Sequence, residues 1–229
     1  MLKYKNVVFD FGNVIATFDE DYILGKFCDS PEDLELLRNA VFYNWAQLDE
    51  GTADYDTSIQ HAKTLVPERL HDNVTDFFRN WHKYLQPIEE IWSLIRKLKE
   101  NGASVYILSN APTHFADHAD FYGIVQEFDG IVFSAPLVMA KPKPEIYQYL
   151  FDTYHLKPEE SFFIDDKPEN IASGQALGMD GYIFKGGYRR GLQKAWIRLK
   201  RQRGQETAVF CPRCLSPAVS LAFFCYLIY

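Results

Sequence analysis

Five short apolar runs, rich in β-branched and aromatic residues, alternate with segments of helical spacing along the chain. They cover residues 7–9, 104–108, 130–133, 161–164 and 181–184. Strands that are apolar on both faces occur where helices cover both sides of a parallel sheet. The pattern therefore predicts an α/β fold with a parallel sheet of five or more strands and helices on both faces.

A stretch of about seventy residues between the first two runs has helical spacing and no strand signal. Ser30 and Pro31 predict the start of a helix that continues through Trp45. Thr52 is the expected cap of a second helix, and Pro67 the expected start of a third. The stretch is predicted to be a helical insert after the first strand.

These boundaries divide the chain into a core, an insert and a tail. The core is residues 1–17 and 87–203, the insert residues 18–86, and the tail residues 204–229. The tail contains Cys211, Cys214 and Cys225 and ends in twelve mostly apolar residues, fewer than the roughly 20 that a membrane-spanning helix needs. One CxxC pair supplies two ligands, whereas structural zinc takes four. We expect the tail to be a poorly ordered appendage.

Composition excludes several classes of protein. Hydrophobic residues at 47% and charged residues at 24% are ordinary globular values, which argues against a disordered or fibrous chain. The net charge of −7 argues against nucleic-acid binding over the whole surface. The first strand follows Met1 too closely to leave room for a signal peptide. We therefore expect a cytoplasmic protein with neither a nucleic-acid nor a membrane partner.

Polar side chains follow four of the five predicted strands. In chain order they are Asp10, Ser109-Asn110, Lys141 and Asp165-Asp166, with Asn170 four residues further on. In open α/β sheets the carboxyl ends of the strands form the ligand crevice, so these side chains are expected to meet. Singly, each has a structural explanation: an aspartate can cap a turn or a helix, and Lys141 can be a solvated lysine.

Together these residues fit phosphoryl transfer. A carboxylate attacking a phosphate dianion meets like charge, which costs about 4 kcal/mol per charge pair at about 4 Å and an effective dielectric near 20. A divalent cation between Asp10 and Asp166, with the ammonium of Lys141, would offset this repulsion. Mg²⁺ is expected, because it accepts one or two carboxylates plus phosphate oxygen and water. Asp10 would form an aspartyl-phosphate that water hydrolyses, and Ser109 would donate to the transferring group.

The same motifs resemble the haloacid dehalogenase superfamily, subfamily IA, over about residues 5–200. The matching stretches are Phe9-Asp10-Phe11-Gly12-Asn13-Val14-Ile15, Ile107-Leu108-Ser109-Asn110, Lys141-Pro142-Lys143-Pro144 and Phe163-Ile164-Asp165-Asp166. The resemblance implies a Rossmann-like core with an α-helical cap over the crevice. It also implies a Mg²⁺-dependent phosphatase that acts on a small phosphorylated metabolite.

The resemblance further implies a role for each residue. Asp10 is the nucleophile, Ser109, Asn110 and Lys141 bind the phosphate, and Asp165 and Asn170 support the site. Asp10, Asp166 and the backbone carbonyl of Gly12 hold the metal.

One position departs from the superfamily pattern. Most of its phosphatases carry a second aspartate, a general acid and base, where this chain has Gly12. Such a group typically contributes 10²–10⁴-fold to the rate. The Asp-x-Gly-Asn-Val form resembles a bacterial branch that includes α-D-glucose-1-phosphate phosphatase, and an anomeric sugar phosphate has a leaving group that needs less protonation. Glu50 or His114 could also supply the proton.

Other functions compete with the phosphatase interpretation. A 2-haloacid dehalogenase also lacks the second aspartate but carries no Asp-Asp pair, so Asp165 and Asp166 favour the phosphatase. A phosphomutase relies on the missing acid. A non-catalytic member that binds a phosphorylated ligand has no need of a nucleophile such as Asp10.

Overall fold

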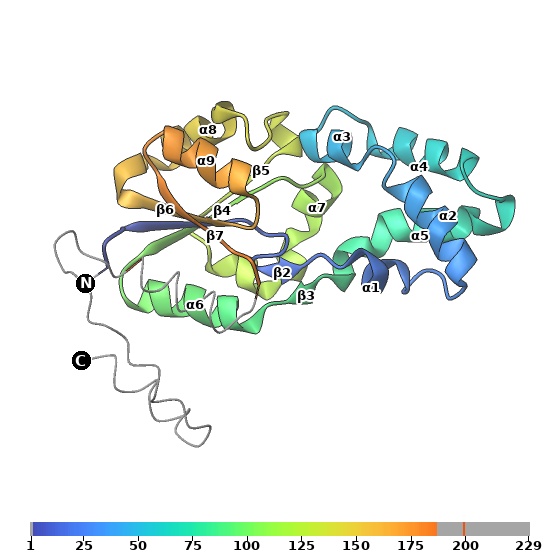
Figure 1. Ribbon diagram of the computed structural model, residues 1–229, viewed down its shortest axis with the longest axis horizontal. Helices are drawn as coiled ribbons and strands as arrows, with labels where there is room; N and C mark the ends of the chain where they lie inside the picture. The colour runs from blue at the N-terminus through green and yellow to red at the C-terminus, as the bar shows by residue number, and fades with distance from the viewer. Residues whose placement is uncertain (1, 187–198, 200–229) are drawn as a thin grey trace, which may run out of the picture.

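The computed structural model describes residues 2–186 and residue 199. At its centre lies a five-stranded parallel sheet with the order β5-β4-β1-β6-β7 (Figure 1). The strands are β1 (Asn6–Phe9), β4 (Ser104–Ser109), β5 (Gly130–Phe133), β6 (Ser161–Asp165) and β7 (Asp180–Ile183). All five predicted strands are present, and the predicted fold class is confirmed.

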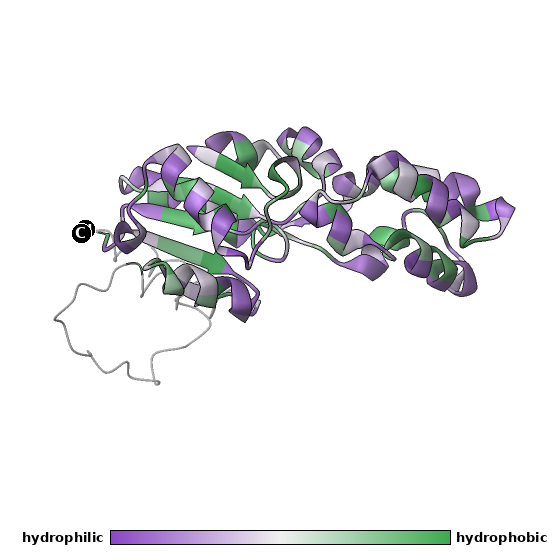
Figure 2. Cartoon of the chain, turned by 90° about the horizontal axis from the view of Figure 1, so that it is seen from above, coloured by the Kyte–Doolittle hydropathy of each residue, from purple (hydrophilic) through white to green (hydrophobic). Residues whose placement is uncertain are grey.

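Helices cover both faces of this sheet. They are α6 (Glu89–Glu100) and α7 (Thr113–His118) on one face, and α8 (Pro144–Tyr154) and α9 (Pro168–Ala176) on the other. The alternation along β1 decides which core each residue joins: Val7 and Phe9 pack with α6 and α7, and Val8 packs with α8 and α9. Figure 2 shows the hydrophobic strands between hydrophilic outer helix surfaces. Burial on both faces explains why the strands read as continuous apolar runs.

Local sequence signals set the ends of these helices. Pro144 and Pro168 each stand at the first position of a helix, where the missing N–H has no intrahelical partner to lose. Helix α6 ends at Glu100 and is followed by the C-cap Asn101 and by Gly102, which has a φ of +81°, a left-handed conformation that favours glycine. Short 3₁₀ helices complete the chain: η1 (Glu68–Leu70), η2 (Trp81–Tyr84), η3 (Ala119–Phe121), η4 (Gly123–Glu127), η5 (Ala135–Leu137) and η6 (Pro158–Glu160).

Five helices form a group of their own beyond the carboxyl edge of the sheet (Figure 1). They are α1 (Glu20–Leu24), α2 (Pro31–Val41), α3 (Trp45–Glu50), α4 (Tyr55–Thr64) and α5 (His71–Asn80). The prediction that one helix runs through Trp45 is wrong, because α2 ends at Val41 and Trp45 begins α3. The break brings both Phe42 and Trp45 against the ring of Phe77, with centroids 5.7 and 6.2 Å away.

The cap expected for the second of these helices is also wrong. Helix α4 is capped by Asp54, whose Oδ1 accepts a hydrogen bond from the N–H of Thr57 at 2.7 Å. The Thr52 hydroxyl instead donates to the carbonyl of Gln47. A carboxylate is the better acceptor at a helix N-terminus, where the helix dipole also favours negative charge.

A two-stranded antiparallel ribbon connects this helical group to the sheet. Its strands β2 (Ala16–Thr17) and β3 (Gln86–Pro87) pair directly, with Thr17 opposite Gln86. The sequence did not predict the ribbon, because two residues are too few to show a strand period. It places the entry and the exit of the helical group side by side.

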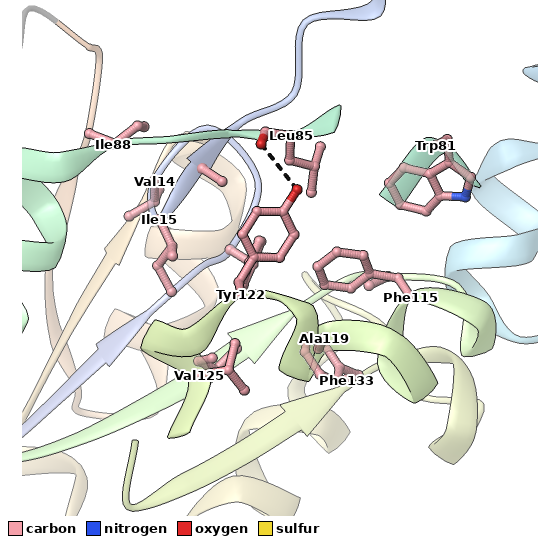
Figure 3. Close-up of a cluster of buried hydrophobic side chains, with 14 of the residues drawn as sticks. Val14, Ile15, Trp81, Leu85, Ile88, Phe115, Ala119, Tyr122, Val125 and Phe133 are labelled. Carbon is pink, nitrogen blue, oxygen red and sulfur yellow. Dashed lines mark hydrogen bonds between the residues drawn. The ribbon is translucent and has the colours of Figure 1, made fainter. Parts of the chain in front are cut away.

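An aromatic cluster packs the helical group against the core (Figure 3). The rings of Trp81 and Phe115 are stacked with centroids 5.6 Å apart. The buried hydroxyl of Tyr122 donates to the carbonyls of His82 and Leu85, at 2.7 and 3.0 Å. These hydrogen bonds join the chain leaving the helical group to the segment after α7.

Among the described residues, no helix is both long and apolar enough to cross a membrane. The predictions for the tail, including Cys211, Cys214 and Cys225, lie outside the described residues, as does the end of the predicted core except for Leu199.

Candidate active site

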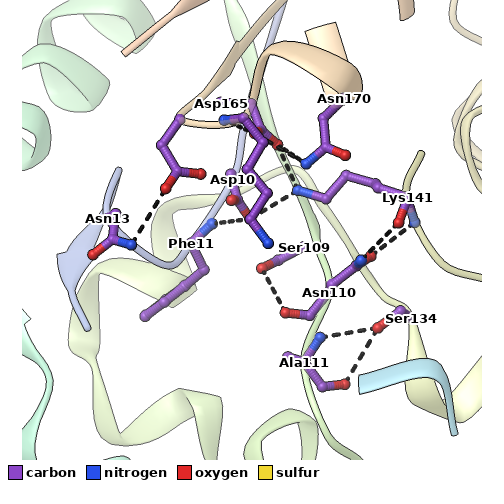
Figure 4. Close-up of polar contacts among 12 residues, drawn as sticks. Asp10, Phe11, Asn13, Ser109, Asn110, Ala111, Ser134, Lys141, Asp165 and Asn170 are labelled. Carbon is purple, nitrogen blue, oxygen red and sulfur yellow. Dashed lines mark hydrogen bonds and ion pairs between the residues drawn. The ribbon is translucent and has the colours of Figure 1, made fainter. Parts of the chain in front are cut away.

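A buried lysine lies at the centre of the site (Figure 4). The Nζ of Lys141 lies 2.9 Å from Oδ1 of Asp10 and 2.6 Å from Oδ2 of Asp165. Burial acts to lower the pKa of Lys141, but the two carboxylates raise it above its ordinary value. The lysine therefore remains a fixed positive charge at the carboxyl edge of the sheet.

Asp10 follows directly after β1, the middle strand of the sheet. Its Oδ1 accepts a hydrogen bond from the N–H of Phe11 at 2.8 Å, which fixes the carboxylate. Burial raises the pKa of Asp10 to about 6, while Lys141 lowers it and Asp165 raises it. At pH 7 Asp10 is mostly ionised, as a carboxylate nucleophile requires.

The two consecutive aspartates after β6 differ in their surroundings. Asp165 is fully buried and saturated: it accepts from Lys141, from the N–H of Lys167 at 2.7 Å and from Asn170 at 3.0 Å. Asp166 is half-buried, lines the pocket and accepts one hydrogen bond, from Asn13 at 3.3 Å. Burial and the neighbouring Asp165 raise the pKa of Asp166. Asp165 therefore fixes Lys141, and Asp166 faces the pocket.

Three carboxylates gather at this point of the site. Oxygen atoms of Asp10, Asp165 and Asp166 lie within 4.8 Å of one another, a grouping that the described residues show nowhere else. Because the donors are oxygens only, the set fits a hard cation such as Mg²⁺. Asp165 is already occupied by hydrogen bonds, which leaves Asp10 and Asp166 as the side chains able to hold the ion. Gly12 lines the same pocket.

The loop after β4 brings Ser109 and Asn110 to the same place. Ser109 is buried, and a hydrogen bond from its side chain lowers the pKa of Asp10. Asn110 makes two hydrogen bonds with the backbone of Lys141, accepting at 2.8 Å and donating at 2.9 Å. The side chain of Asn110 is thus used to position the lysine, and its backbone carbonyl accepts from the Ser109 hydroxyl at 3.4 Å, which leaves the backbone N–H for a ligand.

Sequence reasoning missed one residue that organises this loop. Ser134 directly follows β5, and its hydroxyl accepts from the N–H of Ala111 at 2.9 Å (Figure 4). The same hydroxyl donates to the carbonyl of Asp49. The signal was present, since a polar residue at the carboxyl end of a parallel strand is the feature that identified the other site residues. Ser134 therefore links the loop after β4, which carries Ser109 and Asn110, to helix α3.

A pocket of about 220 Å³ lies above Asp10, between the sheet edge and the helical group. From the core its lining includes Asp10, Ser109, Lys141, Asp166 and Lys167, and from the opposite side it includes Phe18, Trp45, Asp49, Trp81 and Leu85. This volume is below the roughly 300–1,000 Å³ that is common for ligand pockets, which suits a small metabolite.

Neither of the two proton donors suggested by the sequence lines this pocket. Glu50 lies 3.4 Å from the ammonium of the exposed Lys143. His114 stacks on Tyr55, and its Nε2 lies 3.2 Å from the carbonyl of Arg79. Asp49, one residue before Glu50, is the acid of the helical group that lines the pocket.

Comparison with known proteins adds an independent line of evidence. A family model for the haloacid dehalogenase-like hydrolases matches residues 4–178. A sesquiterpene phosphatase of Aspergillus oryzae is 29% identical over 179 residues, which cover 78% of this chain and 88% of that protein. A D-ribitol-5-phosphate phosphatase of Bacteroides thetaiotaomicron is 26% identical over 195 residues, covering 78% and 90%.

Solved structures share the fold at lower identity. A family enzyme from Bacteroides thetaiotaomicron, crystallised with magnesium and inorganic phosphate, superposes with a TM-score of 0.63 at 24% identity, covering 80% of this chain and 96% of that one. An L-2-haloacid dehalogenase from Xanthobacter autotrophicus has a TM-score of 0.59 at 16% identity, covering 89% and 92%. An enzyme crystallised with magnesium and phosphate and a haloacid dehalogenase thus share this fold. The fold alone therefore does not identify the reaction, and the site residues must do so.

Proposed function

The chain belongs to the haloacid dehalogenase-like hydrolases, and on this premise we propose that it is a Mg²⁺-dependent phosphatase of small phosphate monoesters. The observation that carries the proposal is the buried ammonium of Lys141, which touches both the Asp10 nucleophile and the supporting Asp165. Lys141 cancels one of three neighbouring carboxylate charges. The remaining negative charge favours a divalent cation at Asp10 and Asp166, together with the carbonyl of Gly12.

The proposed reaction has two steps. Asp10 attacks phosphorus, the ester bond breaks, and its electron pair goes to the leaving oxygen. Water then attacks phosphorus, and Asp10 is released as a carboxylate with inorganic phosphate. Lys141 and Ser109 bind the phosphoryl oxygens throughout, and the backbone of the Ser109-Asn110 loop donates to them. When bound, Mg²⁺ supplies positive charge that offsets the repulsion between the nucleophile and the phosphate.

A dehalogenase activity is the alternative that this site supports less well. Haloacid turnover needs no metal, so it gives no reason to place Asp166 beside two other carboxylates at a ligand pocket. The Aspergillus oryzae and Bacteroides thetaiotaomicron relatives described above are named as phosphatases, which agrees with this argument. A non-catalytic binding role would leave the fixed, ionised Asp10 without a purpose.

The identity of the alcohol released from the phosphate separates two candidate substrate classes. One candidate class is the sugar phosphates predicted from the Asp-x-Gly-Asn-Val motif, with glucose 1-phosphate as the example. We propose residues 18–86 as a cap over the crevice, and the surface that it turns to the pocket is mostly apolar, with Phe18, Trp45, Trp81 and Leu85. That observation favours an apolar alcohol, and the name of the Aspergillus oryzae relative points the same way.

Phosphate release from a panel of esters tests this proposal. The panel contains glucose 1-phosphate, glucose 6-phosphate, ribitol 5-phosphate and geranyl monophosphate, each assayed with Mg²⁺ and with EDTA. We expect Mg²⁺-dependent phosphate release that disappears in Asp10→Asn. If the apolar surface of residues 18–86 determines substrate preference, geranyl monophosphate should be hydrolysed faster than the sugar phosphates. Equal turnover of glucose 1- and 6-phosphate would contradict the anomeric-phosphate hypothesis. Metal-independent turnover of 2-chloropropionate, without phosphate release, would replace the phosphatase with a dehalogenase.

A further inference from the structure

The missing acid at Gly12 leaves the leaving group without an obvious proton donor, and one unsatisfied carboxyl group lies in the same pocket. Among the described residues, Oδ1 of Asp49 and Oδ1 of Asn44 are the buried side-chain oxygens without a hydrogen-bond partner. Only Asp49 lines the pocket with Asp10. A buried carboxyl oxygen without a partner is costly, so its presence beside the nucleophile calls for a functional reason.

The backbone of Asp49 is fixed relative to the loop after β4. Its carbonyl accepts from Ser134, whose hydroxyl also accepts from the N–H of Ala111, two residues after Ser109. Gly51 lets helix α3 approach the core closely, because a Cβ at this position would lie 2.1 Å from the carbonyl oxygen of Ala135. The end of α3 is thus held through Ser134 to the loop that contains Ser109, and it packs closely against Ala135 at the start of η5.

The surroundings of Asp49 suit a group that exchanges a proton. It is the one ionisable side chain that the helical group contributes to the pocket lining, among aromatic and aliphatic neighbours. Burial raises the pKa of Asp49 to about 7, with Asp10 also raising it and Lys167 and Lys141 lowering it. Both protonation states are therefore populated near neutral pH, which is the condition for an efficient general acid and base.

We propose that Asp49 is a catalytic residue that protonates the leaving-group oxygen and then activates the water, in place of the aspartate absent at Gly12. In the first step the P–O ester bond breaks as Asp10 bonds to phosphorus, and the leaving oxygen takes the proton of Asp49. In the second, the Asp49 carboxylate takes a proton from water as the water oxygen bonds to phosphorus and Asp10 leaves. Asp49 ends the cycle protonated, and the products are the alcohol and inorganic phosphate.

This inference rests on the proposed phosphatase function, and two esters with different leaving groups test it. Benzyl phosphate releases a strongly basic alkoxide that needs protonation, whereas p-nitrophenyl phosphate releases a stable phenolate that does not. In Asp49→Asn we expect kcat/KM for benzyl phosphate to fall about 10²- to 10⁴-fold. With p-nitrophenyl phosphate we expect a first turnover close to wild type, followed by slow steady-state release because water is no longer activated.

The neighbouring acid provides a matched control. Glu50→Gln removes a carboxylate from the adjacent position, where it pairs with Lys143 rather than lining the pocket, so both esters should behave as with wild type. The pH profile gives a second readout: wild-type kcat/KM for benzyl phosphate should fall above pH of about 7 as Asp49 loses its proton, and Asp49→Asn should lack this limb. Circular dichroism and thermal unfolding show that the variants are folded.

The possible outcomes test the role of Asp49 and the phosphatase function separately. Equal losses of kcat/KM on both esters, or no loss on either, in a folded Asp49→Asn would overturn the role of Asp49 while Asp10-dependent release by wild type upheld the phosphatase. Release by wild type no greater than that by Asp10→Asn, on every ester, would overturn the phosphatase and the role of Asp49 with it.

Discussion

The two walls of the pocket are built on opposite principles. On the core wall a network of hydrogen bonds and ion pairs is centred on buried charged groups: Lys141 holds Asp10 and Asp165, and Asn170 and Asn110 complete the network. The wall contributed by the helices is aromatic and aliphatic, with Asp49 as its single ionisable group. The comparison teaches that the proposed phosphate site is preorganised by contacts within the core, whereas the proposed leaving-group side depends on how the helices dock.

The largest expected effect comes from removing the charge that the core wall is built around. Lys141→Met leaves Asp10 and Asp165 facing each other without a cation, and breaking a buried ion pair in this way costs about 3–5 kcal/mol. Urea unfolding measures the loss. Lys143→Met is the matched control, because the exposed Lys143 pairs with Glu50 at 3.4 Å and surface pairs contribute less than about 1 kcal/mol. Similar losses in both variants would show that the core network is not special.

Docking of the helical wall is tested at Gly51. A methyl group there meets the carbonyl of Ala135, and the φ of +72° is unfavourable for alanine. Gly102 has a φ of +81° but open space around its Cβ position, so Gly102→Ala shows the backbone effect alone, about 1–2 kcal/mol. We expect Gly51→Ala to lose about 1–3 kcal/mol more, and to lose activity on benzyl phosphate that Gly102→Ala retains. Equal stability and activity of the two variants would refute tight docking at Gly51.

The junction of the two walls should be sensitive to acid. Burial, with His114 and His118 nearby, lowers the pKa of the buried His82 to about 4. The unfolded chain takes up this proton near pH 6.5 and the folded chain only near pH 4, so stability is lost as the pH falls between these values. The loss is at most about 1.4 kcal/mol per pH unit.

Urea unfolding at pH 7, 6 and 5 measures this effect. His82→Gln should flatten the decline, whereas the same change at the exposed His61 should leave it as in wild type. A decline of equal slope in all three proteins would assign the acid sensitivity to other groups.

Much of the fold could be predicted because its main strands carry a dense local signal. Strands β1, β4, β5 and β6 are buried along nearly their whole length, so most of their residues are apolar. The β2–β3 ribbon could not be found, since Ala16 and Thr17 derive their strand conformation from pairing with Gln86 and Pro87 across the helical insert. The break after Val41 had the same origin: it depends on where the Phe77 ring lies, which is a tertiary fact.

The site likewise has residues that the sequence could predict and residues that it could not. Asp10, Ser109, Lys141 and Asp166 were predictable because parallel strands must end at one edge, whatever lies between them. Asp49 and Glu50 are adjacent acids at the end of one short helix, and the sequence has no feature that says which of them faces the pocket. The docking of α3 through Ser134 and Gly51 decides this, and it directs Asp49 inward and leaves Glu50 with Lys143.

The ribbon that joins the helices to the core has a consequence for how this architecture can be inherited. Because Thr17 lies opposite Gln86, the whole insert enters and leaves through neighbouring backbone positions. A different insert could be grafted there without rerouting any strand of the sheet. Related chains could therefore differ in the insert that contacts the substrate while they keep the same phosphate chemistry on the core. Because the proposed proton donor Asp49 lies in the insert, it would be replaced together with the insert.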